Sequence, residues 1–379
     1  MHIRSLSARH FRNLSQISLQ FANDLFVLIA PNGTGKTNVL EAIHLLSTGR
    51  SIRAEKEADL LEWRQAEPQF ARVDGLIDDG EQEHNITIKL QSIPNRTRIK
   101  KTITVDDVNK RSTELPSIFP TLFFTPDTLR VIAGSPSRRR EFFDQVCSVY
   151  SPQYAPALRH YSRALQHRNS ILREQKHADS MYALLEPWDD QLARYGAIVI
   201  ATRQLVTNHC MTVLSTLAPV LHREKQQQTL TYIAHLLNME ESVEQKEIIT
   251  ILLSALKSHR QRDCLLGSTS IGPHRDDWES MLGTFSLRSF GSRGQQRMGS
   301  IALLISCHQT ISDQLGKPPV LLLDDLFSEL DSEHSNLLFT YLSQKKSQTF
   351  ISATDTAHVP PLVQKQGTVL DIEQILKKE

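Results

Sequence analysis

The 379-residue chain carries 43 Lys and Arg residues against 42 Asp and Glu residues, which gives a formal net charge of +1. This balance excludes a histone-like, strongly basic nucleic-acid binder, but it leaves room for a local basic surface, because a sum carries no positions. With 40% hydrophobic and 22% charged residues, the composition is that of a globular protein rather than a disordered or collagenous one.

Three observations narrow the class of protein further. The longest uncharged stretch of note, residues 204–222, is too polar to span a membrane, so we expect no membrane segment. The N-terminus lacks a basic segment followed by an apolar run, so we expect no signal peptide. No two of the four cysteines have CxxC spacing, which favours buried free thiols in a reducing cytoplasm over a zinc site or a disulfide framework.

Strand signals dominate the N-terminal part of the chain. Residues 3–8 and 17–21 alternate between apolar and polar side chains, and residues 25–29 form a continuous apolar run, typical of a strand buried on both faces. A glycine-rich loop and a helical pattern over residues 36–46 follow, and residues 70–108 return to strand patterns. Strand, loop and helix in this order indicate an α/β unit.

The hydrophobic period becomes helical from residue 139 to about residue 262, which predicts a mainly helical insertion. Beyond it, short apolar runs at residues 320–323 and 349–352 flank a helical pattern over residues 332–344. Strand, helix and strand at this spacing are typical of a parallel sheet.

The loop after the third strand predicts a phosphate site. It nearly fits the pattern G-x-x-x-x-G-K-[ST], in which backbone N–H groups cradle phosphates, the lysine neutralises the β- and γ-phosphates and the last hydroxyl binds Mg²⁺. We expect its residues, with the following Asn38, to bind ATP: Ala30, Pro31, Asn32, Gly33, Thr34, Gly35, Lys36 and Thr37. Ala30 replaces the first glycine; a negative φ there keeps the loop, whereas a positive φ strains it by about 1 kcal/mol or more.

Two carboxylates end the apolar run at residues 320–323. A buried strand delivers such groups to the edge of the sheet where α/β proteins bind ligands. We expect Asp324 to hold Mg²⁺ and Asp325 to orient or deprotonate an attacking water, which makes Asp325 and Lys36 the candidate catalytic residues.

A third motif comes before the helical run that starts near Met298. Ser292, Gly294 and Gln295 offer a hydroxyl, backbone amides and the positive end of a helix, which suit a γ-phosphate presented by another subunit. An ordinary capped helix is the alternative interpretation. The polar segment at residues 328–331 follows the two carboxylates closely.

In chain order, these motifs resemble the ATPase heads of ABC-type proteins, and more specifically the RecF family of bacterial recombination-mediator ATPases. Further matching segments extend over nearly the whole chain: residues 11–13, 38–43, 49–53, 134–144, 166–169 and 272–277. The resemblance implies an α/β fold, an ABC/SMC-type P-loop ATPase head (residues 1–127 and 266–379) with an inserted, mainly helical arm domain (residues 128–265).

The resemblance also implies the partners and the roles of further residues. It implies ATP and Mg²⁺ as cofactors, and an ATP-dependent homodimer in which Ser292 acts on the partner's nucleotide. It implies DNA as a ligand, RecR and RecO as partners, and a role in recombinational repair, replication-fork maintenance and SOS induction. Arg12 and Asn13 resemble residues that line the base side of the nucleotide pocket, and Asp127 stands where relatives carry a group that contacts metal or water. Thr354 stands where transporters place a switch histidine, which indicates slow hydrolysis. The resemblance further implies that DNA stimulates this hydrolysis.

Charge is segregated along the chain. Residues 128–177 hold nine basic and three acidic residues, and residues 179–250 hold five basic and nine acidic ones. The basic segment predicts sequence-independent binding to a phosphate backbone, either of single-stranded DNA or of a gapped duplex. The alternative is a solvated helix face whose tyrosines pack inside the arm. The candidate contacts are Arg138, Arg139, Arg140, Arg159, Arg163 and Arg168.

Two other functions fit parts of the pattern. A transporter-type ABC ATPase subunit shares the phosphate loop, but the 256 positions between Lys36 and Ser292 exceed what transporter heads use. A nucleotide-binding DNA clamp with negligible turnover is the second alternative. The motif at residues 272–277 suggests polar packing between head lobes, or a contact with nucleotide or DNA.

Overall fold

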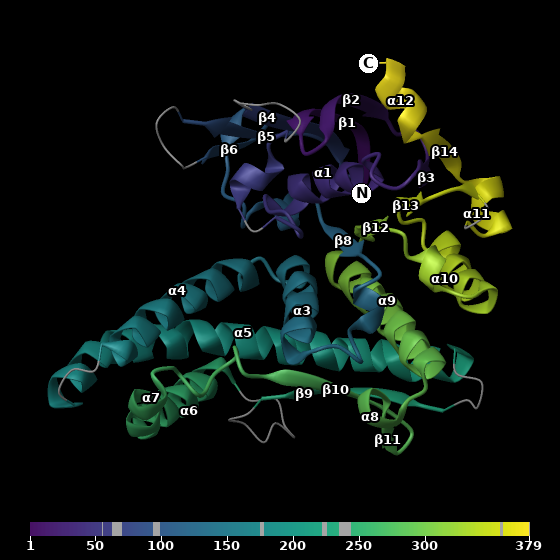
Figure 1. The fold of residues 1–379 in the computed structure, drawn as a ribbon. Helices are drawn as coiled ribbons and strands as arrows, with labels where there is room; N and C mark the ends of the chain where they lie inside the picture. Colours follow the sequence, from purple (N-terminus) through teal and green to yellow (C-terminus); the bar gives the residue numbers. More distant parts are fainter. Residues whose placement is uncertain are drawn as a thin grey trace. The chain divides into compact units, whose positions relative to one another are not determined.

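The computed structural model describes residues 1–54, 56–62, 70–93, 99–174, 178–221, 226–234, 244–356 and 359–378 (Figure 1). Two compact units make up the fold: unit 1 consists of Met1–Leu129 and Ile311–Glu379, and unit 2 of Arg130–Thr310. The arm expected from the sequence covers residues 128–265, and unit 2 also includes residues 266–310.

Unit 1 contains two sheets. A six-stranded antiparallel sheet has the order β2-β1-β4-β5-β6-β7, and a five-stranded parallel sheet has the order β14-β3-β13-β12-β8. The antiparallel strands are β1 (His2–Phe11), β2 (Leu14–Gln20), β4 (Phe70–Asp78), β5 (Glu83–Ser92), β6 (Ile99–Val105) and β7 (Val108–Asn109). The parallel strands are β3 (Leu25–Ile29), β8 (Thr121–Phe124), β12 (Val320–Leu323), β13 (Thr349–Ala353) and β14 (Thr368–Asp371). The helices are α1 (Lys36–Thr48), α2 (Leu115–Ile118), α10 (Ser332–Gln344), α11 (Pro361–Gln366) and α12 (Ile372–Lys378).

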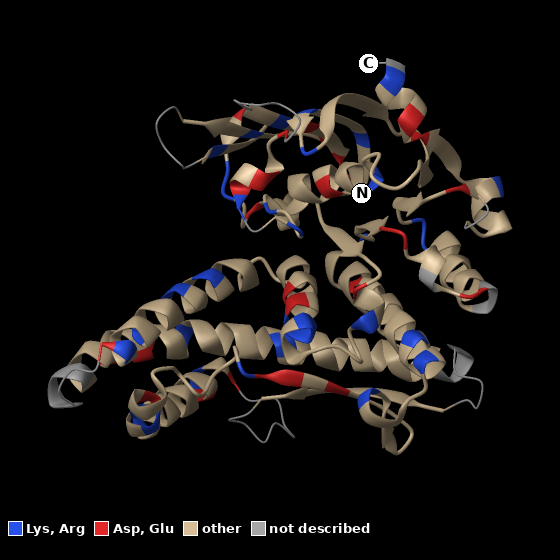
Figure 2. Cartoon of the chain, in the orientation of Figure 1, with Lys and Arg blue, Asp and Glu red and all other residues tan. Residues whose placement is uncertain are grey.

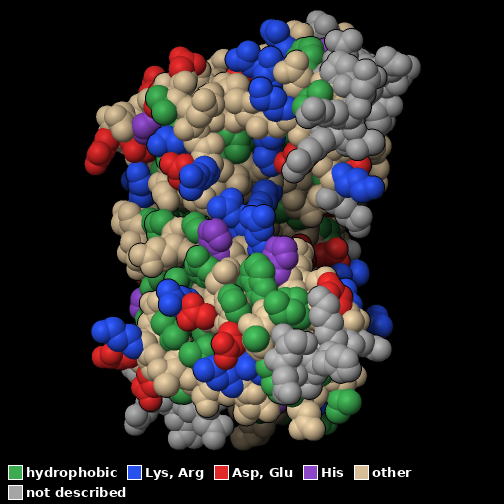
Figure 3. All heavy atoms as spheres, turned by 90° about the vertical axis from the view of Figure 1, so that its left-hand side faces the viewer, with side chains coloured by type: hydrophobic (Ala, Val, Ile, Leu, Met, Phe, Trp, Pro, Cys, Tyr) green, Lys and Arg blue, Asp and Glu red, His purple; other side chains and the backbone are tan. Residues whose placement is uncertain are grey.

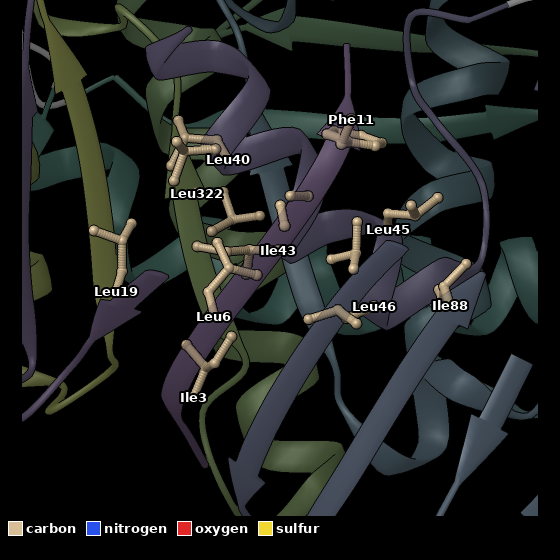
Figure 4. Packing of buried hydrophobic residues seen from close by; sticks show 14 of the residues in the cluster. Ile3, Leu6, Phe11, Leu19, Leu40, Ile43, Leu45, Leu46, Ile88 and Leu322 are labelled. Atoms are coloured by element: carbon tan, nitrogen blue, oxygen red, sulfur yellow. The ribbon is translucent and has the colours of Figure 1, made fainter. Parts of the chain in front are cut away.

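Helix α1 forms the centre of the hydrophobic core of unit 1. Its side chains Leu40, Ile43 and Leu46 are fully buried and meet residues of both sheets, such as Leu6 of β1 and Leu322 of β12 (Figure 4). Helix α1 and strand β4 approach closely at Gly75, where an added Cβ would lie 2.4 Å from Leu46 Cδ1. The two sheets therefore sandwich the helix that follows the phosphate loop, which fixes the start of that helix.

Unit 2 is mainly helical, as the sequence predicts, but it also contains a sheet. Its helices are α3 (Pro136–Tyr150), α4 (Tyr154–Arg173), α5 (Ala178–Leu221), α6 (Gln245–Ser258), α7 (Arg260–Leu266), α8 (Leu287–Phe290) and α9 (Arg293–Leu315), of which α9 continues into unit 1. Its antiparallel sheet, β11-β10-β9, consists of β9 (Gln228–Ile233), β10 (Asp277–Leu282) and β11 (Phe285–Ser286). The prediction of a helical pattern over residues 139–262 missed β9, because this six-residue strand pairs with a strand that lies far away in the sequence.

The sequence predicts no membrane segment and four free thiols. Among the described residues, no helix is both long and apolar enough to cross a membrane. All four cysteines are free; Cys147, Cys210 and Cys307 are buried, and Cys264 is half-buried.

His44 of α1 makes the stability of unit 1 depend on pH. The ring is buried, its Nδ1 lies 3.0 Å from Thr121 Oγ1, and burial lowers the pKa of His44 from its ordinary value of 6.5 to about 3. The unfolded chain therefore binds this proton more tightly than the folded protein, and stability falls as the pH drops below about 6.5.

We predict that His44→Gln, which keeps a polar partner for Thr121 but does not titrate, reduces this pH dependence. Between pH 7 and pH 5, the wild type should lose about 2 kcal/mol more unfolding free energy than the variant. Urea denaturation at both pH values measures the difference, and equal losses in the two proteins would contradict the assignment.

Candidate nucleotide site

The phosphate loop connects β3 to α1, as the sequence predicts. Gly33 and Gly35 have φ values of 81° and 123°, in the region that favours glycine. A Cβ on Gly35 would also lie 2.9 Å from Asn13 Oδ1, whereas one on Gly33 would meet nothing within 4 Å. The two glycines are thus required for different reasons: conformation alone at Gly33, and conformation with close packing at Gly35.

Lys36 is buried at the start of α1. Its ammonium donates hydrogen bonds to the carbonyl oxygens of Ala30, at 2.6 Å, and Pro31, at 3.1 Å. Burial lowers the pKa of Lys36, and the nearby carboxylates of Asp325 and Asp324 act in the opposite direction. The side chain therefore arches over its own loop, where it can neutralise phosphate oxygens held by the backbone amides.

Asp324 joins three segments of the parallel sheet. Its Oδ1 accepts a hydrogen bond of 2.9 Å from Thr37 Oγ1 and one of 2.7 Å from Ser352 Oγ, at the end of β13. A hydroxyl and a carboxylate from two separate segments are the protein ligands that Mg²⁺ accepts when phosphate and water complete its coordination. Ser352 was not among the residues that we expected here, and its only sequence signal is a polar residue inside an apolar run.

Asp325 is held in an unusual state. Its φ is +46°, in the left-handed region, and its buried Oδ1 has no hydrogen-bond partner among the described residues. The backbone is fixed by its own N–H, which donates to Ser352 Oγ at 2.9 Å, and by Ser328 Oγ, which donates to its carbonyl at 2.7 Å. A strained residue with a buried, unsatisfied oxygen is typical of a functional site, where a ligand or water completes the hydrogen bonds.

Asp127, the third expected metal residue, is exposed on the segment that follows β8. Since β8 lies beside β12 in the parallel sheet, the segments that carry Asp127 and Asp324 leave the same edge of the sheet. Within the described part of the chain, no group of three or more His, Cys, Asp and Glu side chains is gathered as for an all-protein metal site.

Ala30 does not strain the loop. It is buried, and it is absent from the six described non-glycine residues with positive φ, so its backbone needs no glycine. Of the two possibilities left open by the sequence, the structure therefore supports the unstrained one.

Arg12 and Asn13 both brace the phosphate loop and α1. Arg12 forms a two-point ion pair with the fully buried Glu41 of α1, with N–O distances of 3.1 and 2.8 Å. Asn13 Nδ2 donates to the carbonyl of Gly33 at 3.0 Å, and its Oδ1 accepts from Asn38 Nδ2 at 2.6 Å. Glu41 was missed as a positioning residue, because a lone Glu inside an apolar helical pattern does not reveal its partner.

Ser292 is the N-cap residue of helix α9 in unit 2. Its Oγ accepts from the backbone N–H of Gln295 at 3.3 Å, while its own N–H donates to Gln295 Oε1 at 2.9 Å. These two reciprocal hydrogen bonds form a capping box. The geometry of Ser292 is therefore that of an ordinary capped helix, the alternative interpretation given above. Ser292 and Gly294 are nevertheless both exposed, and a Cβ on Gly294 would meet nothing within 4 Å. The cap therefore presents a hydroxyl and backbone amides at the surface of unit 2.

The predicted DNA contact is contradicted by burial for two of the six arginines. Arg139 is 3% exposed and forms a two-point ion pair with Asp277. Arg168 is fully buried between Asp189 and Asp263, with N–O distances of 2.7 Å to each. Both guanidinium groups are paired with carboxylates inside unit 2, so they cannot reach a phosphate backbone. The sequence did not predict this, because a count of charges along the chain does not reveal burial.

Three exposed basic residues of the segment, Arg159, Arg163 and Arg173, lie on α4, and Arg130 is exposed in the turn before α3. Arg159 and Arg163 are exposed and one helical turn apart, and Figure 2 shows the basic residues along this helix. Tyr154 and Tyr161 are buried, as the alternative interpretation expected. The face drawn in Figure 3 shows Lys and Arg side chains at several places on the surface. The remaining two arginines, Arg138 and Arg140, are both half-buried.

Comparison with known proteins identifies the family. Residues 2–374 match the family model described as "RecF/RecN/SMC N terminal domain". The chain is 32% identical over 360 residues to "DNA replication and repair protein RecF" of Halothermothrix orenii, covering 94% of this chain and 92% of the relative. It is 30% identical over 374 residues to the protein of the same name from Clostridium tetani, covering 98% of each. The chain belongs to the RecF family.

Solved structures agree with this assignment to the RecF family. The chain is similar to the structure titled "recombination mediator protein RecF-ATPrS in RecFOR pathway", with a TM-score of 0.85, 28% identity and coverage of 98% of this chain and 96% of the other. An SmcHead, solved with the C-winged helix domain of ScpA, has a TM-score of 0.54 and 13% identity, which shows the shared fold alone. The α/β SMC-type head expected from the sequence is thus confirmed.

We predict that Ala30→Gly leaves ATP affinity unchanged, since Ala30 already has an unstrained backbone. The variant should lose about 0.5–1 kcal/mol of unfolding free energy, because glycine adds freedom to the unfolded chain. Titration with a fluorescent ATP analogue measures the affinity. The control is Gly33→Ala, which adds a Cβ to open space at positive φ and should weaken binding through backbone strain alone; tighter binding by Ala30→Gly would contradict the prediction.

Proposed function

We propose that this protein is an ATP-dependent DNA-binding protein of recombinational DNA repair and replication-fork maintenance, which dimerises on ATP to hold DNA and hydrolyses ATP slowly. The observation that carries the proposal is the hydrogen bond between Thr37 and Asp324, which unites a phosphate loop with a strand-end carboxylate 287 residues away. RecF relatives that match almost the whole chain, and a similar structure titled RecF-ATP, support it.

In the proposed site, each residue has one task. Backbone amides of residues 30–37 and the Lys36 ammonium would bind the ATP phosphates. Thr37 and Asp324 would hold Mg²⁺, and Asp127 follows the strand next to the one that Asp324 follows. The metal supplies neutralisation of the developing phosphate charge. The unpaired Oδ1 of Asp325 orients the attacking water.

The second half of the site comes from a partner copy. Ser292, Gly294 and Gln295 at the start of α9 would contact the γ-phosphate bound by the other protomer, because their hydroxyl and amides favour an anion. ATP then links two chains and acts as a timer for DNA release. Family resemblance adds RecR and RecO as partners, a role in SOS induction and a place in the bacterial cytoplasm at the nucleoid.

The function of a transporter-type ATPase subunit has less support than the proposed one. The RecF relative from Clostridium tetani matches 98% of this chain, which includes the arm region. A clamp with negligible turnover differs from the proposal only in the rate of hydrolysis. Measurement of ATP turnover with and without DNA separates the two.

We predict that Lys36→Ala abolishes ATP-induced dimerisation, whereas Asp325→Asn keeps it and lengthens the lifetime of the dimer on DNA. The first change removes the cation that neutralises the phosphates, and the second removes only the group that acts on water. Sedimentation velocity with and without ATP, together with phosphate release, measures both. Dimers of Lys36→Ala with ATP, or unchanged turnover in Asp325→Asn, would contradict these roles.

We predict that the double variant Arg159→Ala/Arg163→Ala binds DNA more weakly, without a change in sequence preference. The slope of log affinity against log salt should fall by about two, one for each arginine that neutralises a phosphate. Fluorescence anisotropy with ATP present, at several salt concentrations, measures the slope. Arg194→Ala on α5 is the control, because Arg194 is 68% exposed but paired with Asp190; an equal loss in this control would remove α4 as the specific contact.

A further inference from the structure

The motif at residues 272–277 lies inside unit 2 and is held from several helices. Tyr161 Oη of α4 lies 2.6 Å from His274 Nδ1, and Arg203 of α5 donates to the carbonyl of Pro273 at 2.7 Å. Arg140 of α3 donates to the carbonyl of Asp276 at 2.9 Å. The motif is therefore polar packing within unit 2, and it delivers its last residue, Asp277, to the start of β10 in a fixed position.

Asp277 accepts hydrogen bonds from two arginines of different elements. Arg139 of α3 makes a two-point contact, with distances of 2.6 and 2.8 Å, and Arg288 of α8 reaches the same carboxylate at 3.3 Å. Burial acts to raise the pKa of Asp277, but the hydrogen bond from Arg139 and the other positive partners hold it below its ordinary value. The carboxylate thus stays ionised and binds both cations.

Arg139 also fixes the turn in front of its own helix. Its Nη1 donates to the carbonyls of Ile132, at 3.2 Å, and Gly134, at 2.6 Å. This guanidinium is almost fully buried and binds carbonyl and carboxylate oxygens on several sides, so it has little freedom to move. Asp277 is consequently anchored to the rigid base of α3 on one side.

Arg288 connects Asp277 to Ser292, Gly294 and Gln295. We call these the signature residues, and the segment that carries them the signature segment. It belongs to α8, whose carbonyls at Leu287 and Arg288 accept hydrogen bonds of 2.9 and 3.2 Å from Gln296 Nε2 in the first turn of α9. The connection between the helices is tight, because a Cβ on Gly291 would lie 2.6 Å from the Leu287 oxygen. Movement of α8 therefore moves Ser292, which lies between α8 and the first turn of α9.

A second contact holds α9 to the same strand. Gln228 Nε2 donates to the carbonyl of Gly299, in the second turn of α9, and to Ser280 Oγ of β10, both at 3.0 Å. This contact fixes the body of the helix, whereas the contact through Arg288 fixes the segment in front of it. Loss of Asp277 would release the segment that carries Ser292 and leave α9 itself attached.

We propose that Asp277 is the positioning residue of the signature segment: by binding Arg139 and Arg288 together, it holds the Ser292 hydroxyl and the amides beside it in the orientation that a partner's nucleotide requires. This inference rests on the proposed ATP-dependent dimer, and it names a residue that touches no nucleotide. It assigns the motif at residues 272–277 to the half of the site that acts in trans.

The test compares variants of the Asp277–Arg288 pair, which leads to the signature segment, with a variant of a buried ion pair elsewhere in unit 2. Asp277→Asn and Arg288→Ala should each weaken ATP-dependent dimerisation by about tenfold or more, the size expected when a charged hydrogen-bond pair is broken. Binding of a fluorescent ATP analogue to the monomer should not change, because the phosphate loop belongs to unit 1. Asp277→Glu, which retains the charge, should recover part of the dimerisation. Arg288 is 41% exposed, so its variant should fold even if Asp277→Asn does not.

Asp189→Asn is the matched control. Asp189 is a buried carboxylate of unit 2 that also binds two arginines, but these are Arg168 of α4 and Arg260 of α7 rather than residues of α8 or α9. The control should lower the thermal stability as much as Asp277→Asn and leave dimerisation intact. Wild-type affinity in Asp277→Asn and Arg288→Ala, or an equal loss in Asp189→Asn, would overturn the inference.

Ser292→Ala distinguishes failure of the inference from failure of the proposed function. If Ser292→Ala loses dimerisation while both Asp277→Asn and Arg288→Ala keep it, the proposed dimer is supported and the positioning role of Asp277 is refuted. If the wild type does not dimerise with ATP, the proposed function falls and the inference falls with it.

Discussion

The hydrogen bond between Thr37 and Asp324 depends on the order of strands in the parallel sheet. In the order β3-β13-β12-β8, the phosphate loop follows β3, Ser352 lies near the end of β13, Asp324 follows β12 and Asp127 follows β8. All four segments lie at the carboxyl edge of the sheet, where ligands of α/β proteins bind. Strand β13 separates the two halves of the site, and Ser352 bridges them with its hydroxyl.

The same site concentrates features that do not favour stability. Lys36 is buried, Asp325 has a left-handed backbone, and one of the buried oxygens of Asp325 has no hydrogen-bond partner in the described part of the chain. Each feature costs of the order of 1–3 kcal/mol in a folded protein. The sandwich of two sheets around α1 offsets these costs, since the leucines and isoleucines of the helix are fully buried. The core thus stabilises a phosphate loop that is arranged for ligand rather than for its own packing.

Short-range patterns were sufficient to predict the parts of the site that lie at strand ends. The apolar run at residues 25–29 and its glycine loop, and the run at residues 320–323 with its carboxylates, carry their structure in consecutive residues. Strand β9 and the buried ion pairs were not predicted, because their partners lie far away in the sequence. The roles of Glu41 and Ser352 likewise appear only when two segments are brought together.

Burial decides which basic residues of the chain are available at the surface. The basic segment at residues 128–177 loses Arg139 to Asp277 and Arg168 to Asp189, and both carboxylates lie outside the segment in sequence. Removal of these pairs from solvent leaves Arg159 and Arg163 as exposed cations of α4. Since long-range attraction between exposed charges is screened within about 10 Å at ordinary salt, two local cations attract a phosphate backbone only when it is already near. A contact of this kind needs a second event to stabilise it. The proposed ATP-dependent pairing of two chains would double the number of cations facing one DNA and so would meet that requirement.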